Sequence, residues 1–156
     1  MVRPEDIADS RQRRLLEHWQ RLRGARAMPA RRELDPLDIP YALGELFLID
    51  VEGDPPVFRY RLTASKLVEF TGYDLVGRTV DDVPGDANRA QLLAAYRRIV
   101  AAREPVLIEG AREAKGQWWS YALLGLPLSD DGVRVDSLAI HQVYDRRKPV
   151  EPPKSR

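Results

Sequence analysis

The chain has 156 residues, of which 44% are hydrophobic and 31% charged, with a net charge of +1 and no cysteine. This length predicts one domain with a real hydrophobic core, and the polar N-terminus does not resemble a secretory signal, so a cytoplasmic location is expected. The lack of cysteine excludes disulfides, thiol catalysis and cysteine-ligated metals, and no apolar run is long enough to cross a membrane.

The first predicted element is a helix that starts at Asp9 or Ser10 and ends near Arg23, before Gly24. One face of this helix carries an apolar stripe made of Leu15, Leu16, Trp19 and Leu22. Such a stripe needs a partner surface, which is either the sheet of the same chain or a homodimer or partner interface. Both alternatives stay open, and the stripe is the candidate interface.

Residues 1–35 contain nine Arg against six acidic residues, and residues 145–156 contain five basic against two acidic residues. Basic ends on an acidic middle leave open a nucleic-acid-binding regulator that uses the Arg-rich N-terminal segment. Glu17, Glu33 and Asp35 interrupt that basic run, so nucleic acid is not the expected partner.

Three prolines make residues 28–41 an extended connector, with a short helical turn at Asp35 and Pro36. The apolar run that follows predicts a central strand over 42–50. A turn at Asp54, Pro55 and Pro56 then returns the chain antiparallel along a half-buried strand over 57–63. The predicted organisation is an N-terminal helix and connector (1–41), a core domain (42–145) and a disordered, basic and proline-rich tail (146–156).

A short helix is expected from Ser65, which is a candidate N-cap, and it stops at Gly72. Gly77 makes a second sharp turn, and we expect a positive φ at one or both glycines. A longer helix over 86–103 ends before Pro105. The last three strands are expected over 106–113, 117–128 and 133–144.

Five strands with the helices inserted between the second and third indicate an α+β fold built on one five-stranded antiparallel sheet, with helices on one face and an N-terminal flanking helix. The segments FRYRLTASKLVEFTGYDLVGR, MPARRELDPLDIP and LLGLPLSDDG together resemble the PAS domain family. The resemblance covers most of the chain and is closest to the single-domain PAS proteins of alphaproteobacteria. It implies the strand order 2-1-5-4-3.

The same resemblance implies a stand-alone sensory or regulatory module that binds a small ligand, a signalling partner, or both. A homodimer and a separate signalling protein, such as a histidine kinase or a regulator, are the partners that it implies. Haem is not expected, because haem-binding relatives carry a histidine on the long helix and residues 86–103 contain none. Cysteinyl-flavin is not expected without cysteine, and the sequence does not identify another cofactor.

The residues themselves indicate neither an active site nor a metal site. The only histidines are His18 and His141, and neither has a second ligand at metal-binding spacing. No acid–base pair with an orienting partner is visible, so the chain is predicted not to be an enzyme, although a small enzyme with an α+β cone pocket stays an alternative.

A ligand cavity is predicted between the sheet and the helices, where the apolar faces of several elements meet. Its candidate residues are Tyr60, Phe70, Leu92, Tyr96, Tyr121 and Gln142.

Overall fold

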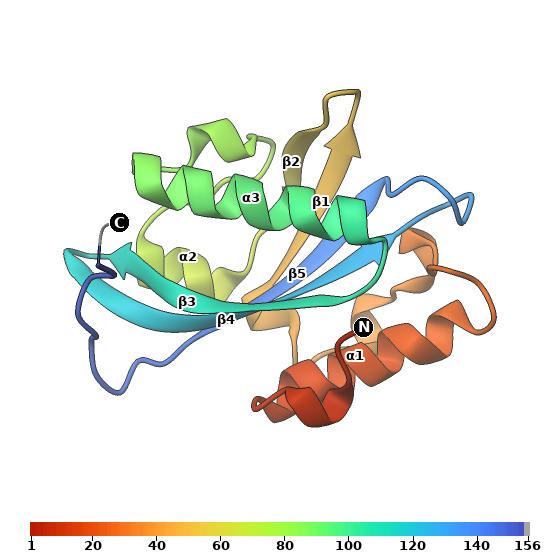
Figure 1. Ribbon diagram of the computed structural model, residues 1–156, viewed down its shortest axis with the longest axis horizontal. Helices are drawn as coiled ribbons and strands as arrows, with labels where there is room; N and C mark the ends of the chain where they lie inside the picture. The colour runs from red at the N-terminus through yellow and green to blue at the C-terminus, as the bar shows by residue number, and fades with distance from the viewer. Residues whose placement is uncertain (155–156) are drawn as a thin grey trace.

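One antiparallel sheet of five strands runs through the molecule in the order β2-β1-β5-β4-β3 (Figure 1). The structure, a computed structural model, describes residues 1–154. The strands are β1 (Leu46–Glu52), β2 (Val57–Leu62), β3 (Val106–Ala114), β4 (Gln117–Leu128) and β5 (Ser137–Tyr144). The predicted α+β class and the strand order are confirmed.

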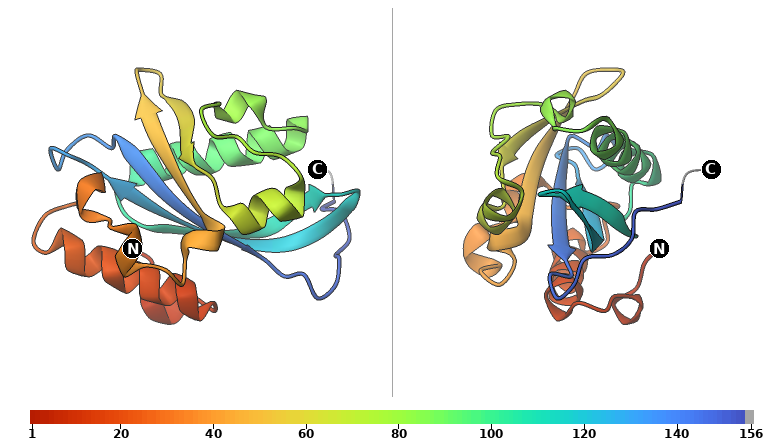
Figure 2. Two further views of the ribbon diagram at one scale, coloured as in Figure 1. Left: turned by 180° about the vertical axis from the view of Figure 1, so that it is seen from behind. Right: turned by 90° about the vertical axis from the view of Figure 1, so that its left-hand side faces the viewer.

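Three helices cover the two faces of the sheet (Figures 1 and 2). The short helix α2 (Ser65–Thr71) and the long helix α3 (Asp86–Ala102) lie on one face, which we call the inner face. The N-terminal helix α1 (Ser10–Arg23) lies on the opposite, outer face. Single 3-10 turns make up much of the connections: η1 (Pro4–Asp6), η2 (Arg31–Glu33), η3 (Pro36–Asp38), η4 (Leu43–Glu45) and η5 (Val80–Asp82).

The helix ends follow local chemistry that was only partly predicted. Asp9 caps α1, because its carboxylate accepts hydrogen bonds from the backbone N–H groups of Arg11 and Gln12 at 2.9 and 3.2 Å. The proposed cap at Ser65 is wrong: Ala64 is the N-cap of α2, and Ser65 is already the first helical residue.

The loop before β5 is longer than the predicted hairpin, so β5 begins at Ser137 rather than Val133. The carboxylate of Asp131 holds this loop, because it accepts hydrogen bonds from the backbone N–H groups of Val133 and Arg134, both at 2.8 Å. Residues that bond to a turn in this way cannot join the β4–β5 ladder at the same time.

Helix α3 packs closely on β4 where β4 carries a glycine. A Cβ atom on Gly125 would lie 2.7 Å from Cγ1 of Ile99, which is fully buried. The absence of a side chain at this position therefore sets how near α3 approaches the inner face.

Gly72 and Gly77 both have positive φ, at 89° and 80°, as expected. Gly72 ends α2 in the left-handed conformation, and its N–H donates to the carbonyl of Val68 at 2.8 Å. A Cβ at either glycine would meet no atom within 4 Å, so only the backbone conformation selects glycine there.

We therefore expect Gly72→Ala and Gly77→Ala each to lower the free energy of unfolding by about 1 kcal/mol, because a Cβ atom disfavours the left-handed region. Urea denaturation measures this cost. Gly116→Ala, at a turn with φ 77° and open space around it, is a matched comparison and should behave alike. Unchanged midpoints in all three variants would contradict the argument.

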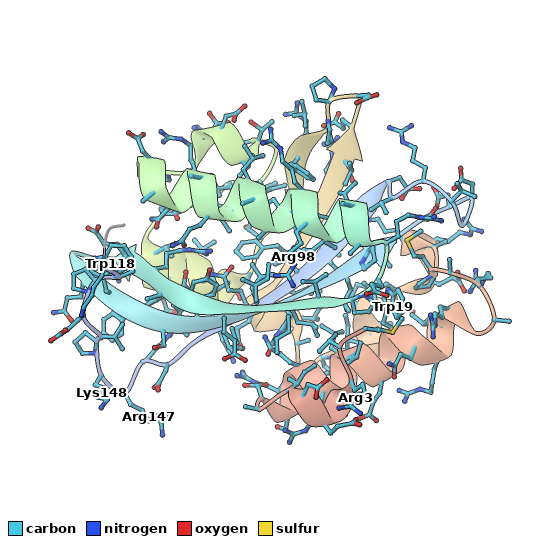
Figure 3. All side chains as sticks on the ribbon, in the orientation of Figure 1. Arg3, Trp19, Arg98, Trp118, Arg147 and Lys148 are labelled. Carbon is cyan, nitrogen blue, oxygen red and sulfur yellow. The ribbon has the colours of Figure 1, made fainter. Side chains whose placement is uncertain are left out.

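The C-terminal segment runs back along the end of β4. The N–H of Val150 donates to the carbonyl of Trp118 at 2.7 Å, and the guanidinium of Arg146 lies 4.4 Å from the ring centre of Phe70. Figure 3 shows Arg147 and Lys148 on this segment and Trp118 at the neighbouring strand end. The predicted tail thus contacts the core as far as Val150, while the division of the chain at 41 and 145 stays a prediction.

Among residues 1–154, the helices are too short or too polar for any of them to traverse a lipid bilayer.

Candidate functional site

A small cavity lies between the inner face of the sheet and α2 and α3. Its volume is about 30 Å³, which is room for one water molecule. Strands β2, β3 and β5 contribute Tyr60, Arg112, Gln142 and Tyr144 to its polar wall, and α3 contributes Tyr96. The lining residues are Phe47, Tyr60, Thr63, Leu67, Val68, Thr71, Tyr73, Leu75, Leu92, Tyr96, Arg112, Gln142 and Tyr144.

Four of the six predicted pocket residues line this cavity, namely Tyr60, Leu92, Tyr96 and Gln142. Phe70 and Tyr121 do not. Their rings pack instead against the ring of Tyr144, with centroids 4.9 and 6.2 Å apart. Tyr144 itself lines the cavity, so Phe70 and Tyr121 stand behind it. A ligand-binding role for any of these residues stays a prediction.

Two buried phenols meet at the cavity wall. The hydroxyl oxygens of Tyr60 and Tyr96 are 2.8 Å apart, with 1% and 0% of these residues exposed. Burial raises the pKa of Tyr60 well above its ordinary value, against the hydrogen bond from Tyr96, and burial raises the pKa of Tyr96 as well. Both groups are therefore neutral phenols at physiological pH.

Arg112, on β3, places a guanidinium inside this cavity, and only 4% of the residue is exposed. Its Nε donates to Oε1 of Gln91 and its Nη1 to the hydroxyl of Tyr144, both at the long distance of 3.5 Å. The carbon Cζ lies 4.3 Å from the ring centre of Tyr121. Nη2 is buried and has no hydrogen-bond partner among residues 1–154.

The charge on Arg112 is kept despite burial. Burial acts to lower the pKa of Arg112, whereas Tyr144, Tyr121 and Tyr96 act to raise it, and the net direction is upward. The tyrosines act through phenolate charges that form only at high pH, so at neutral pH the guanidinium is charged and no anion of the described residues offsets its burial. The sequence analysis did not identify this residue. The two-residue alternation of side chains along β3 could have identified it, because this alternation puts Arg112 on the same face as the inward-pointing Val106 and Ile108.

A second, open hollow of about 290 Å³ lies beside the cavity, towards the end of α2 and the start of α3. The two share four lining residues: Thr71, Tyr73, Arg112 and Tyr144. Arg112 therefore lies between the cavity and an opening to solvent, where the exposed side chains of Glu113 and Lys115 also lie.

The predicted interface stripe has its partner surface within the same chain. Leu15, Leu16 and Trp19 are fully buried, and Nε1 of Trp19 donates to the carbonyl of Pro127 at 2.9 Å. Leu22 is half-buried at the end of the helix. Within this chain the stripe thus packs in cis on the outer face, and a role of the same residues in a partner interface stays a prediction. A homodimer stays a prediction.

Polar groups also fix α1 to the outer face. The side-chain amide of Gln12 donates to the carbonyls of Ala122 and His141, both at 3.1 Å. The carboxylate of Glu45 pairs with Arg11 at 2.6 Å, and its nearer oxygen is 3.8 Å from Nε2 of the fully buried His141. The carbonyl contacts involve β4 and β5, which also form part of the inner face.

Five of the nine Arg in residues 1–35 already pair with carboxylates of this chain: Arg3, Arg11, Arg26, Arg31 and Arg32. Charges that are paired in this way are less available to phosphate groups. This pairing argues against the alternative of a nucleic-acid-binding segment.

Within residues 1–154 no cluster of three metal-ligating side chains occurs. Both histidines lie away from the cavity, since His18 is on α1 and His141 is on the outer side of β5. Neither histidine is among the described residues that line the cavity.

The sheet order, the helices between the second and third strands, and the cavity under them define a PAS-type sensory domain fold. A family model described as a PAS domain matches residues 7–139, most of the chain. The chain belongs to the PAS domain family. No curated protein matches it.

Several solved structures share the fold. A light-oxygen-voltage domain studied with a flavin analogue is 16% identical, covers 71% of this chain and 84% of its own, and has a TM-score of 0.54. The light state of the blue-light photoreceptor Aureochrome1 is 13% identical, with coverages of 73% and 90% and a TM-score of 0.52. A light-oxygen-voltage protein of Rhodobacter sphaeroides is 19% identical, with coverages of 65% and 59% and a TM-score of 0.51.

These similarities concern the fold alone, and the cavity does not fit a flavin. Ligand pockets for molecules of that size measure about 300–1,000 Å³, whereas this cavity has about 30 Å³. Tyr60, Tyr96 and Arg112 occupy part of the cavity wall, and the chain contains no cysteine.

Proposed function

We propose that this protein is a non-catalytic sensory or regulatory module, which binds a small ligand in the cavity and passes the signal to a separate protein. The cavity itself is the observation that supports this. Buried polar groups cost free energy that apolar packing would avoid, yet the centre of this core holds Tyr60, Tyr96, Arg112 and Gln142.

The residues that line the cavity also support a non-catalytic role. They include no Asp, Glu, His, Lys or Ser. The wall does contain threonine and tyrosine hydroxyls, but burial raises the pKa of Tyr60 and Tyr96, so these two phenols are not ionised to act as a base or a nucleophile at neutral pH.

A physical route leads from the cavity to the outer face. Gln142 lines the cavity. Its neighbour on β5 is His141, whose carbonyl accepts a hydrogen bond from the side-chain amide of Gln12 on α1. A shift of β5 at Gln142 therefore reaches the docked helix within one residue. We propose that α1 and the sheet edge beside it report the state of the cavity to a partner, which includes a second copy of the chain in a homodimer.

Native mass spectrometry of gently purified protein tests the proposal. We expect a small molecule that is retained under gentle conditions and lost on denaturation. Leu92→Trp fills the cavity and should abolish retention, whereas Leu93→Trp, at the next position and outside the lining, should not. The same spectra report whether the protein is a dimer. Retention that is equal in both variants would contradict a ligand in this cavity.

A further inference from the structure

The cavity wall presents several hydrogen-bond donors that other groups of the wall do not use. Tyr144 accepts a hydrogen bond from Nε2 of Gln142 at 2.8 Å and one from Arg112, so its own proton is left to donate. Tyr60 and Tyr96 share one hydrogen bond, which uses only one of their two protons. Nη2 of Arg112 is a further donor without a partner.

The cavity also holds a positive charge without a matching negative one. The contacts of Arg112 in the described part of the chain are an amide, a phenol and an aromatic ring, all neutral. No lining residue is acidic. A buried cation without an anion is costly, and this cost is relieved when a carboxylate or similar group lies in the plane of the guanidinium and accepts hydrogen bonds from its N–H groups.

We propose that the cavity binds a small planar oxyanion, with Arg112 as the anchor and the hydroxyl of Tyr144 as a second donor. The proposal rests on the proposed function and specifies its ligand class. The cavity of about 30 Å³ encloses one water-sized group, such as one oxygen of the anion, and the rest of the anion would lie in the adjoining hollow of about 290 Å³, which Arg112 also lines. A short carboxylate and nitrate share this chemistry, and the open hollow beside Arg112 gives the anion a path to the site.

The first test measures the thermal unfolding midpoint of the whole chain at constant ionic strength in sodium formate, acetate, nitrate or chloride. We expect the midpoint to rise with concentration and to saturate for the planar oxyanions, as linkage requires for a ligand that binds only the folded state. Chloride and the neutral isosteres formamide and acetamide should give no such rise. Saturation by formate or acetate at lower concentration than by nitrate assigns a carboxylate ligand, and the reverse assigns an inorganic one.

The second test uses Arg112→Met with Arg98→Met as its matched control. Arg98 is exposed on α3 and loses the same charge when replaced (Figure 3). Arg112→Met should lose the oxyanion-dependent rise, and Arg98→Met should keep it. In chloride alone Arg112→Met should melt at the same temperature as the wild type or higher, because it removes an uncompensated charge. Saturating formate should reverse that order.

An equal rise in Arg112→Met and in the wild type, or no rise in any oxyanion, overturns the proposal and leaves a single water as the occupant. If Arg112→Met does not fold, a formate titration of the wild type followed through its arginine side-chain ¹H–¹⁵N signals decides. A saturable shift of the Arg112 signals supports the site, and shifts confined to exposed arginines overturn it.

This failure is distinguishable from failure of the proposed function. If native mass spectra show a retained neutral small molecule and no oxyanion affects unfolding, the proposed sensory function stands and only the oxyanion ligand is contradicted. If there is neither a retained molecule nor an oxyanion effect, both proposals are contradicted.

Discussion

Trp19→Ala is expected to lower the free energy of unfolding by about 3–5 kcal/mol, the range for deleting a large buried aromatic side chain. The indole is fully buried between α1 and the outer face. Its removal leaves a cavity and takes away the donor that satisfies the carbonyl of Pro127. It also removes the ring over which the guanidinium of Arg23 lies at 5.4 Å.

Trp19→Phe keeps one aromatic ring but removes the hydrogen bond, worth about 1 kcal/mol, together with part of the buried indole, so its cost should lie between zero and that of Trp19→Ala. Trp118→Ala is a useful comparison, since Trp118 is only half-buried at the far end of β4 and should cost less (Figure 3). Urea denaturation at two protein concentrations provides the measurement. A loss below about 1 kcal/mol for Trp19→Ala would contradict docking in cis.

The concentration dependence addresses the dimer separately. If α1 packs only on its own sheet, the unfolding midpoint of the wild type does not change with protein concentration. A midpoint that rises with concentration, and that loses this rise in Trp19→Ala, would instead place the helix in a shared interface.

The fold was largely predictable because its signals are local. Asp9 before an amphipathic run, Gly72 after a short helix and Pro105 after a long one each fix an element end through backbone chemistry. The wrong N-cap at Ser65 and the late start of β5 have the same origin: Ser and Asp side chains bond to several nearby backbone groups, and the sequence does not say which.

The cavity was less predictable because it depends on side-chain volume across elements far apart in the sequence. Period 2 correctly placed Tyr121 on the inner face, but nothing local showed that the ring of Tyr144 would stand between it and the cavity. Arg112 was missed for a different reason. A charged residue on a strand is ordinarily expected to face solvent. The buried guanidinium of Arg112 departs from this rule at the position where a ligand would bind.

The second large effect is expected from pH and concerns His141. Burial lowers the pKa of His141 to about 4 in the folded chain, and this effect outweighs the nearby carboxylates of Glu45 and Asp9, which act in the opposite direction. Arg11 and Lys66 lower the pKa further. Neither ring nitrogen has a hydrogen-bond partner.

The direction of the pH dependence follows from the depressed folded pKa. Above about pH 6.5 the imidazole is neutral in both the folded and the unfolded chain, and its full contribution to stability is present. As the pH falls towards 4, His141 takes up a proton in the unfolded chain but stays neutral in the folded chain. The free energy of unfolding therefore decreases by about 3 kcal/mol through this one group.

Urea unfolding of the wild type and of His141→Gln between pH 7 and pH 4 measures this contribution as the difference between their two pH slopes. Other groups that titrate in this range affect both proteins and cancel in the comparison. His18→Gln is the matched control, because it removes the other histidine, only half-buried on α1, and should keep most of the slope. Equal slopes in the wild type and His141→Gln would mean that the imidazole takes up its proton in the folded chain. The contact between α1 and the sheet would then tolerate a positive charge beside Glu45.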